Sequence, residues 1–287
     1  MTDFTDTEEV LDGPPPLASG ELLAPGYEVM AHMRRGNHLD VYDVWSEERA
    51  CRVIAKTPRE DRLDDGETVR ALFREGRLLQ KFTHPHIVRA YEVIREPRPV
   101  VILETLTGAT LAYLIDTAPR RLAISDIVHL GLHLCSALHY LHGHDVLHLD
   151  LKPSNIVSEG RLAKIIDLSI ARSPGRGTAG AGTTQYMAPE QAVGGLVSPA
   201  TDVWGVGAVL WESITGEEPF NADHEEDEED PDYEQLERRV VPIRVYRRVP
   251  ATFARLVEDC LEPDPDRRPT VEELMGDLRN FIQQSNR

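Results

Sequence analysis

Short apolar runs separated by polar residues dominate the chain from about residue 27 to residue 103. Runs such as 52–55 and 100–103 have the length and the β-branched content that are typical of strands. The stretch from about Glu67 to Phe82 differs, because its apolar residues recur near helical spacing. This part of the chain is therefore predicted to be a small sheet with one main helix.

After Gly108 the pattern changes to helical periodicity. Between Ile124 and His142 apolar residues recur every three or four positions, and Ser125 is a suitable N-cap for the helix that this spacing predicts. A strand-rich part followed by a helix-rich part indicates the α+β class. Further helices are predicted over 202–215, 250–261 and 271–283.

Two acidic stretches account for most of the net charge of −18. Residues 1–24 contain six acidic residues and residues 223–234 contain nine, and neither stretch has a Lys or an Arg. Such segments bury little apolar surface, so we expect a disordered acidic tail over 1–24 and a solvated acidic loop over 223–234. Acidic surfaces repel nucleic acids and anionic membranes, whereas a basic partner would suit the loop.

The three cysteines, Cys51, Cys135 and Cys260, are far apart and form no C-x-x-C pair. Together with an N-terminus that lacks a basic and apolar leader, this usage indicates a reducing, cytoplasmic location with the three thiols in the core. The longest apolar run, 203–211, is shorter than the roughly 20 residues that a membrane span needs, so no span is expected. Nothing in the sequence indicates the oligomeric state.

Several polar motifs stand at the ends of the predicted elements. Lys56 closes the run Val-Ile-Ala-Lys, and Glu75 lies within the first predicted helix. Residues 148–155 read His-Leu-Asp-Leu-Lys-Pro-Ser-Asn, and Asp167 directly follows an apolar run. Residues 182–190 read Gly-Thr-Thr-Gln-Tyr-Met-Ala-Pro-Glu. These motifs supply the cations and carboxylates that phosphoryl transfer from ATP requires.

The order of these motifs and the residues within them resemble the protein kinase family. Within that family, the bacterial eukaryotic-like serine/threonine kinases are the most similar in general character. The resemblance implies a protein kinase domain over 25–285 with a two-lobed α+β fold. A small antiparallel sheet lobe with one main helix would cover about 27–103, and a larger helical lobe about 108–283. The resemblance further implies that ATP binds in a cleft beneath the sheet and that the substrates are Ser and Thr hydroxyls of proteins.

The same resemblance assigns roles around the catalytic loop. Asp150 would act as the base that orients the substrate hydroxyl, and Lys152 would stabilise the γ-phosphate. Thr183 would hydrogen-bond both side chains, as in family members that act on serine and threonine. Glu190 would form a buried ion pair with Arg268 that anchors the helical lobe.

The nucleotide and metal ligands are also implied by the resemblance. Lys56 would contact the α- and β-phosphates, held in place by an ion pair with Glu75. Asn155 and Asp167 would bind Mg²⁺, for which Mn²⁺ is an alternative. The other residues expected to contact ATP are Gly36, Val41, Leu103, Glu104, Leu106 and Val157.

The glycine-rich loop departs from the family pattern. Aligning Val41 with the valine that follows this loop places Arg34, Gly36 and Leu39 at the three glycine positions. Glycines let backbone N–H groups approach the phosphates, so the loss of two glycines weakens phosphate binding by the backbone of this loop. Arg34 or Arg35 is a candidate to compensate by binding phosphate directly.

Three further substitutions accompany this change. Ile54 replaces the alanine above the adenine ring, Leu149 replaces the arginine before the catalytic base, and Ser169 replaces the glycine after Asp167. These departures keep open a pseudokinase that acts as a nucleotide- or partner-binding module. A small-molecule kinase is a further alternative, although such relatives generally lack the segment ending in Ala-Pro-Glu.

Four histidines, His139, His142, His144 and His148, fall within ten residues and raise the question of a metal site. No cysteine or further histidine completes a usual zinc pattern. Positions at a helix end and in the catalytic loop therefore explain these residues better.

Overall fold

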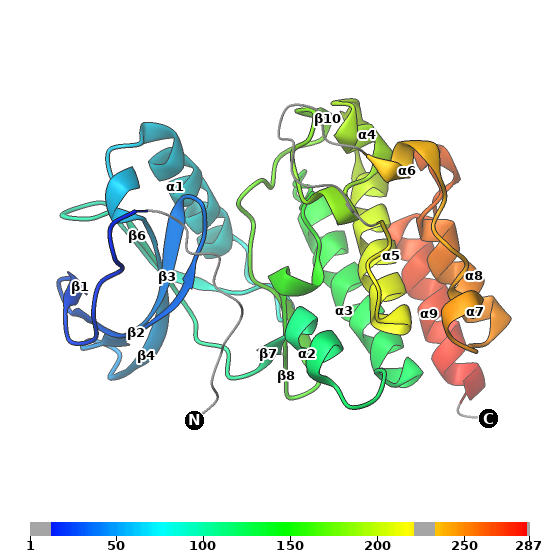
Figure 1. The fold of residues 1–287 in the computed structure, drawn as a ribbon, viewed down its shortest axis with the longest axis horizontal. Helices are drawn as coiled ribbons and strands as arrows, with labels where there is room; N and C mark the ends of the chain where they lie inside the picture. The colour runs from blue at the N-terminus through cyan, green and yellow to red at the C-terminus, as the bar shows by residue number, and fades with distance from the viewer. Residues whose placement is uncertain (1–12, 221–232, 286–287) are drawn as a thin grey trace. The chain divides into compact units, whose positions relative to one another are not determined.

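The computed structural model describes residues 13–220 and 233–285, which form two compact units (Figure 1). The first unit comprises the described residues up to 83 together with 88–105, and the second comprises 84–87 and the described residues from 106 onward. The first is built around a sheet, and the second consists mainly of helices. The predicted two-lobed α+β fold is thereby confirmed.

The sheet of the first unit has six antiparallel strands in the order β1-β2-β3-β4-β6-β5. A short 3₁₀ helix, η1 (Glu60–Arg62), and the long helix α1 (Gly66–Lys81) separate β4 from β5. The strands are β1 (Leu22–Ala24), β2 (Tyr27–Arg35), β3 (Leu39–Ser46), β4 (Cys51–Pro58), β5 (Ala90–Ile94) and β6 (Val100–Leu103).

The helix α1 packs on one face of this sheet, against β4, β5 and β6. A Cβ atom at Gly76 would lie 2.6 Å from Val101 Cγ2 and 2.8 Å from Val93 Cγ2. Both separations are too short for real contacts, so the glycine is what permits the helix to approach these strands so closely. The neighbouring residue, Glu75, is consequently buried against the sheet.

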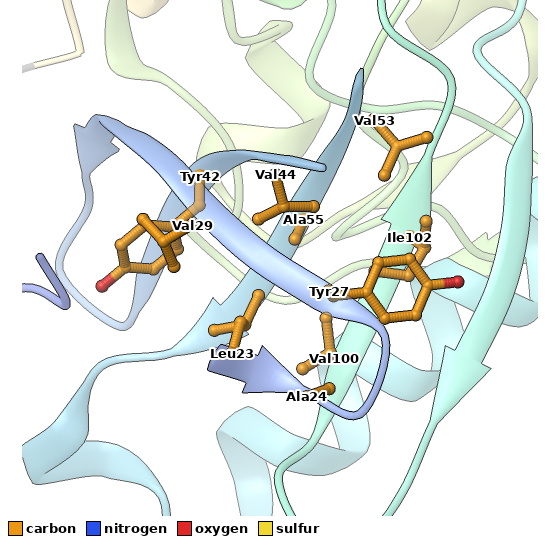
Figure 2. Packing of buried hydrophobic residues seen from close by; sticks show 10 residues of the cluster. All are labelled: Leu23, Ala24, Tyr27, Val29, Tyr42, Val44, Val53, Ala55, Val100 and Ile102. Atoms are coloured by element: carbon orange, nitrogen blue, oxygen red, sulfur yellow. The ribbon is translucent and has the colours of Figure 1, made fainter. Parts of the chain in front are cut away.

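The other face of the sheet carries the apolar core of the unit. Val100 and Ile102 point to it, because successive residues of a strand alternate between the two faces. Figure 2 shows the ten buried side chains of this cluster, with Leu23 and Ala24 contributed by β1. Tyr42 extends the cluster toward the partly buried Leu17, whose backbone N–H donates a hydrogen bond of 3.0 Å to the Tyr42 hydroxyl.

The expected disordered tail over 1–24 is therefore wrong for its last part. Leu22–Ala24 form β1, and Leu17 packs on the sheet. The prediction followed the acidic composition, whereas the few apolar residues of this segment have a sheet face to cover. Residues 1–12 lie outside the described part of the chain.

The second unit contains a three-stranded sheet, β7-β8-β9, and a separate pair of short strands, β10 and β11. Its strands are β7 (Ala109–Thr110), β8 (Ile156–Glu159), β9 (Leu162–Ile165), β10 (Gly175–Arg176) and β11 (Leu196–Val197). Its α-helices are α2 (Leu111–Thr117), α3 (Ile124–His142), α4 (Pro189–Ala192), α5 (Pro199–Thr215), α6 (Glu234–Glu237), α7 (Ile243–Tyr246), α8 (Ala251–Cys260) and α9 (Val271–Ser285). Its 3₁₀ helices are η2 (Pro153–Asn155), η3 (Thr184–Tyr186) and η4 (Pro265–Arg267).

The helix α5 forms the core of this unit, because every residue from Thr201 to Thr215 is buried. Helices α3, α8 and α9 pack against it. A Cβ atom at Gly131 of α3 would lie 2.9 Å from Leu278 Cδ1 and 3.2 Å from Leu210 Cδ1. The glycine therefore lets α3 approach both α9 and α5 closely.

Several boundaries differ from the sequence predictions. Helix α3 begins at Ile124, so Ser125 lies inside its first turn and is not the N-cap, which is Ala123. Residues 84–87 belong to the second unit, because His86 Nδ1 lies 2.9 Å from Ala163 O. Of the three thiols expected in the core, Cys51 is exposed.

The expected acidic loop over 223–234 lies mostly outside the described residues. Its last residue, Glu234, already begins helix α6. Within 13–220 and 233–285, no helix combines the length and the apolar character needed to cross a membrane.

Candidate active site

In the first unit, Lys56 and Glu75 form an ion pair between β4 and α1. Lys56 Nζ lies 2.6 Å from Glu75 Oε1, and the two side chains are 11% and 1% exposed. A carboxylate buried to this degree requires a charged or hydrogen-bonding partner. The contact that the sequence resemblance implied is therefore present, and it fixes the position of the lysine.

In the second unit, the backbone of the catalytic loop is held by a buried carboxylate. Asp202 of α5 accepts hydrogen bonds of 2.8 Å from the backbone N–H groups of both His148 and Leu149. The ring Nε2 of His142 lies 2.8 Å from the same carboxylate. Leu149 has a φ of +69°, which is unusual for a branched side chain. The two N–H bonds to Asp202 hold this backbone conformation in place.

Four side chains of this unit form one hydrogen-bonded set. Lys152 Nζ donates to Thr183 Oγ1 at 2.6 Å, and the threonine hydroxyl donates to Asp150 Oδ1 at 2.7 Å. Asn155 Nδ2 donates to Asp150 Oδ2 at 3.0 Å, and Lys152 Nζ lies 3.3 Å from that oxygen. Each carboxylate oxygen can accept more than one hydrogen bond, so Asp150 retains capacity for a further hydroxyl.

Asp167 follows β9 at a point fixed by the backbone. The N–H of Ile166 donates to Asn155 O at 3.0 Å, so the chain before Asp167 runs beside Asn155. The N–H of Ser169 donates to Asp167 Oδ1 at 2.7 Å. The amide oxygen of Asn155 and the carboxylate of Asp167 are hard oxygen donors, which are the ligands that Mg²⁺ prefers.

The segment ending in Ala-Pro-Glu is anchored by two buried side chains. Gln191 Nε2 donates to Leu149 O and to Ala181 O, both at 2.9 Å. Glu190 accepts two hydrogen bonds of 2.7 and 2.8 Å from Arg268, whose side chain is fully buried. The ion pair implied by the sequence is thus present, and it is bidentate.

Leu149, which replaces the arginine that the sequence resemblance implied, lies in an apolar cluster. It packs with Leu147 and Val197, and the partly buried Ile170 covers them. Strand β10 pairs with β11, the strand that contains Val197. In addition, Leu147 and Arg172 exchange two backbone hydrogen bonds. Apolar packing and strand pairing therefore order the segment after Asp167.

The β2–β3 hairpin stands where the glycine-rich loop was expected, and its two arginines differ in their contacts. Arg35 donates two hydrogen bonds, of 3.0 and 3.1 Å, to the buried Asp40. This pairing holds the pKa of Asp40 below its usual value, although burial opposes the effect. Arg34 is exposed and lies opposite Val41 in the register.

The remaining expected nucleotide contacts are distributed over both units. In the first, Leu103 pairs with Ile54, and the backbone N–H of Glu104 donates to Arg89 O at 2.9 Å. In the second, Leu106 is half-buried, and Val157 of β8 is buried.

The four clustered histidines have other contacts, and His148 Nδ1 accepts a hydrogen bond of 3.1 Å from the backbone N–H of Asp150. His142 contacts Asp202, as described, and His139 Nδ1 lies 2.8 Å from Glu272 Oε1. His144 Nδ1 lies 2.8 Å from Tyr140 O. Within the described ranges, no group of three His, Cys, Asp or Glu side chains is arranged to hold a metal ion.

An acidic residue lies beneath residues 182–190, the segment that ends in Ala-Pro-Glu, hereafter the docking segment. Glu212 of α5 accepts a hydrogen bond of 2.7 Å from the Tyr186 hydroxyl. Burial raises the pKa of Glu212 to about 7; the Tyr186 bond opposes this rise, and the nearby Glu218 and Asp116 add to it. The buried phenol of Tyr186 has its own pKa raised strongly by the same environment.

Three supporting residues were missed by sequence reasoning. Gln191 joins the catalytic loop to the docking segment, and Glu212 lies beneath it, as described above. Gln235 of α6 donates to Thr184 O at 3.0 Å and to Met187 O at 3.1 Å. Only Gln191 had a signal in the sequence, namely its position directly after the Ala-Pro-Glu motif.

Comparison with known proteins agrees with this geometry. The protein kinase domain profile matches residues 27–278. Serine/threonine-protein kinase PknB of Mycolicibacterium smegmatis is 34% identical over 250 residues, which cover 79% of this chain and 38% of PknB. The DNA damage-responsive serine/threonine-protein kinase RqkA of Deinococcus radiodurans is 32% identical over 267 residues, which cover 88% of this chain and 39% of RqkA.

A solved structure also shows the same fold. The crystal structure of the PknI kinase domain of Mycobacterium tuberculosis matches with a TM-score of 0.73 at 20% sequence identity. The match covers 93% of this chain and 100% of the PknI chain. By contrast, the chain spans about two fifths of the length of PknB and RqkA.

Proposed function

This chain belongs to the protein kinase family, and we propose that it transfers the γ-phosphate of ATP to serine and threonine hydroxyls of proteins. The observation that carries the proposal is the hydrogen-bonded set of Asp150, Lys152, Asn155 and Thr183. It places a carboxylate, a cation and a hydroxyl within 2.6 to 3.3 Å of one another. Such a set suits in-line transfer of a charged phosphoryl group to a hydroxyl.

Asp150 is proposed to orient the attacking hydroxyl. The substrate oxygen forms a bond to the γ-phosphorus, the bond from that phosphorus to the bridging oxygen of ADP breaks, and Asp150 accepts the hydroxyl proton. Thr183 holds one oxygen of Asp150 and Asn155 holds the other. These contacts fix the carboxylate before substrate arrives, which lowers the cost of positioning.

Two lysines are proposed to balance the charge on the phosphates. Lys56, fixed by Glu75, contacts the α- and β-phosphates, and Lys152 contacts the transferred group. Asn155 and Asp167 offer the oxygen atoms that would hold magnesium. Bound Mg²⁺ would supply charge neutralisation on the β- and γ-phosphate oxygens.

The remaining nucleotide-binding residues are part of the same proposal. Val41, Leu103, Leu106 and Val157 have apolar side chains, which suit contact with adenine. The backbone N–H of Glu104, directly after β6, donates to Arg89 O, so its carbonyl oxygen is the group proposed to contact the edge of adenine. The proposed substrates are proteins.

The test is phosphotransfer from γ-labelled ATP with Mg²⁺ to a protein substrate mixture. We expect Asp150→Asn and Asp167→Asn to lower the rate by about 10² or more, the loss typical of removing a preorganised charged group. The matched control is Asp145→Asn, because Asp145 is exposed and its φ of +56° suits asparagine. Its rate should equal that of the unaltered chain.

Two results would contradict the proposal. In the first, the unaltered chain binds ATP but transfers no phosphate to any protein, to itself or to water. In the second, transfer occurs but persists at the same rate in Asp150→Asn. The first result would instead support a nucleotide-binding module without activity.

A further inference from the structure

The face of the sheet that bears Lys56 carries a second cation. In the register of the sheet, Arg34 lies opposite Val41, and Val41 lies opposite Lys56. Residues directly opposite one another in antiparallel strands project from the same face. Arg34 and Lys56 therefore lie on one face, two strands apart, with their Cα atoms separated by about 10 Å.

The neighbouring arginine projects from the opposite face. Arg35 pairs with Asp40, and His32 Nε2 lies 3.0 Å from the same carboxylate. The His32 ring packs edge-on against Tyr42, which belongs to the apolar cluster shown in Figure 2. Arg35 is thus committed to a buried carboxylate and is not available for a ligand on the Lys56 face.

The side chain of Arg34 is exposed and makes no hydrogen bond or ion pair with any residue in the described ranges 13–220 and 233–285. On the same face, the carboxylate of Asp43 is paired with Arg52, and Lys56 is paired with Glu75. Within each pair, the positive and the negative charge cancel. Arg34 therefore adds a positive charge that these neighbours do not neutralise.

The backbone of this hairpin offers less to an anion than a glycine-rich loop does. The N–H of Gly36 donates to Leu39 O at 2.8 Å, so it is engaged within the hairpin. Leu39 lies two positions before Val41 on β3, so its side chain projects from the same face as Val41. A side chain thus occupies a place where glycine would let backbone approach a phosphate.

We propose that Arg34 is a phosphate-binding residue for the nucleotide, and that its side chain takes over the role of the lost glycine backbone. This inference rests on the proposed function, because it assigns a ligand to the ATP of that reaction. A guanidinium can hydrogen-bond two phosphate oxygens at once, which an amide N–H cannot do. A triphosphate carries charge along its length, so it can contact two cations spaced as Arg34 and Lys56 are.

The experiment measures the dissociation constants of ATP and of adenosine by calorimetry, with Mg²⁺ present. Arg34→Ala should weaken ATP binding about tenfold, equal to about 1.4 kcal/mol, and leave adenosine binding unchanged. Arg34→Lys should bind ATP with an affinity between those of Arg34→Ala and the unaltered chain, because lysine keeps the charge but cannot hydrogen-bond two phosphate oxygens in the planar geometry of a guanidinium. Arg70→Ala is the matched control, since Arg70 is an exposed arginine of α1 in the same unit, and it should bind ATP normally.

Three results would overturn the proposal. The first is ATP binding by Arg34→Ala within twofold of the unaltered chain. The second is an equal loss for adenosine, which would indicate altered packing, and a thermal melt of each variant checks the same point. The third is an equal loss in Arg70→Ala, which would indicate a non-specific charge effect.

The test also separates this inference from the proposed function. If the unaltered chain transfers phosphate but Arg34→Ala binds ATP normally, the role of Arg34 is wrong and the kinase activity stands. If ATP binding depends on Arg34 but no phosphate is transferred, the role of Arg34 stands and the kinase activity does not.

Discussion

The buried carboxyl of Glu212 leads to a prediction about stability and pH. Glu212 lies in α5 beneath the docking segment, with Tyr186 donating to it and with Glu218 and Asp116 nearby. Burial raises its pKa from 4.5 to about 7. The folded protein therefore keeps a proton on Glu212 over a pH range in which the unfolded chain has lost it.

The sign and the size of the effect follow from this difference. Between pH 4.5 and about pH 7 the folded state binds more protons than the unfolded state, so stability falls as pH rises through this window. A difference of about 2.5 in pKa corresponds to about 3 kcal/mol in the free energy of unfolding. This amount is a large fraction of the stability of a typical domain.

Glu212→Gln should remove the pH-dependent term. Glutamine keeps an oxygen that can accept the Tyr186 hydrogen bond, but it cannot ionise. Urea unfolding should show the variant about 3 kcal/mol more stable than the unaltered chain at pH 8, and nearly equal to it at pH 4.5. Glu217→Gln is the matched control, because Glu217 is the exposed glutamate nearest in the sequence to α5.

Either of two results would refute this reasoning. If Glu212→Gln is less stable than the unaltered chain at pH 8, the carboxylate is stabilised by its surroundings and its pKa is not raised. A stability difference that is the same at pH 4.5 and at pH 8 would also refute it, because the effect would then come from packing.

Three other perturbations have defined outcomes. Lys56→Met should lower kcat by about 10² or more and also lower the melting temperature, because the buried Glu75 loses its partner. Adding Glu75→Gln to this variant should restore the melting temperature but not kcat. Recovery of both would show that the reaction does not require Lys56. Arg268→Leu should cost about 3–5 kcal/mol in urea unfolding, since it leaves a buried carboxylate unpaired, and a loss below about 1 kcal/mol would contradict the buried pair. Ser173→Ala combined with Thr178→Ala should leave kcat/KM within about twofold, because apolar packing orders this segment, and a tenfold fall would show that phosphorylation is required.

The catalytic loop, residues 148–155, could be predicted from the sequence because its functional residues lie within one short stretch of the chain. Asp150, Lys152 and Asn155 are close in the chain, and their spacing already indicates a shared site. The position of Thr183 was implied by the family resemblance, and the structure brings its hydroxyl to Asp150. Likewise, the helix predicted from about Glu67 to Phe82 is α1, displaced by one residue at each end.

The supporting contacts could not be predicted in the same way. Gln191 and Gln235 donate to backbone carbonyl oxygens, which every residue possesses, so no pairing of residue types marks these contacts. The choice between Arg34 and Arg35 also required the structure, because the register of β2 beside β3 shifts twice, once between Val29 and Ala31 and once between His32 and Arg34. A one-residue shift exchanges the two faces of a strand, and the sequence alone does not show it.

The strand β1 has a practical consequence for work with shortened forms of this protein. The family match begins at residue 27, whereas β1 ends at Ala24 and pairs with the start of β2. A protein trimmed to the matched range would lose this strand and make β2 the edge of the sheet there. Exposed edge strands with an apolar face readily pair with other molecules, so such a protein should tend to aggregate. Retaining residues 17–24 would keep both the edge and the apolar face covered.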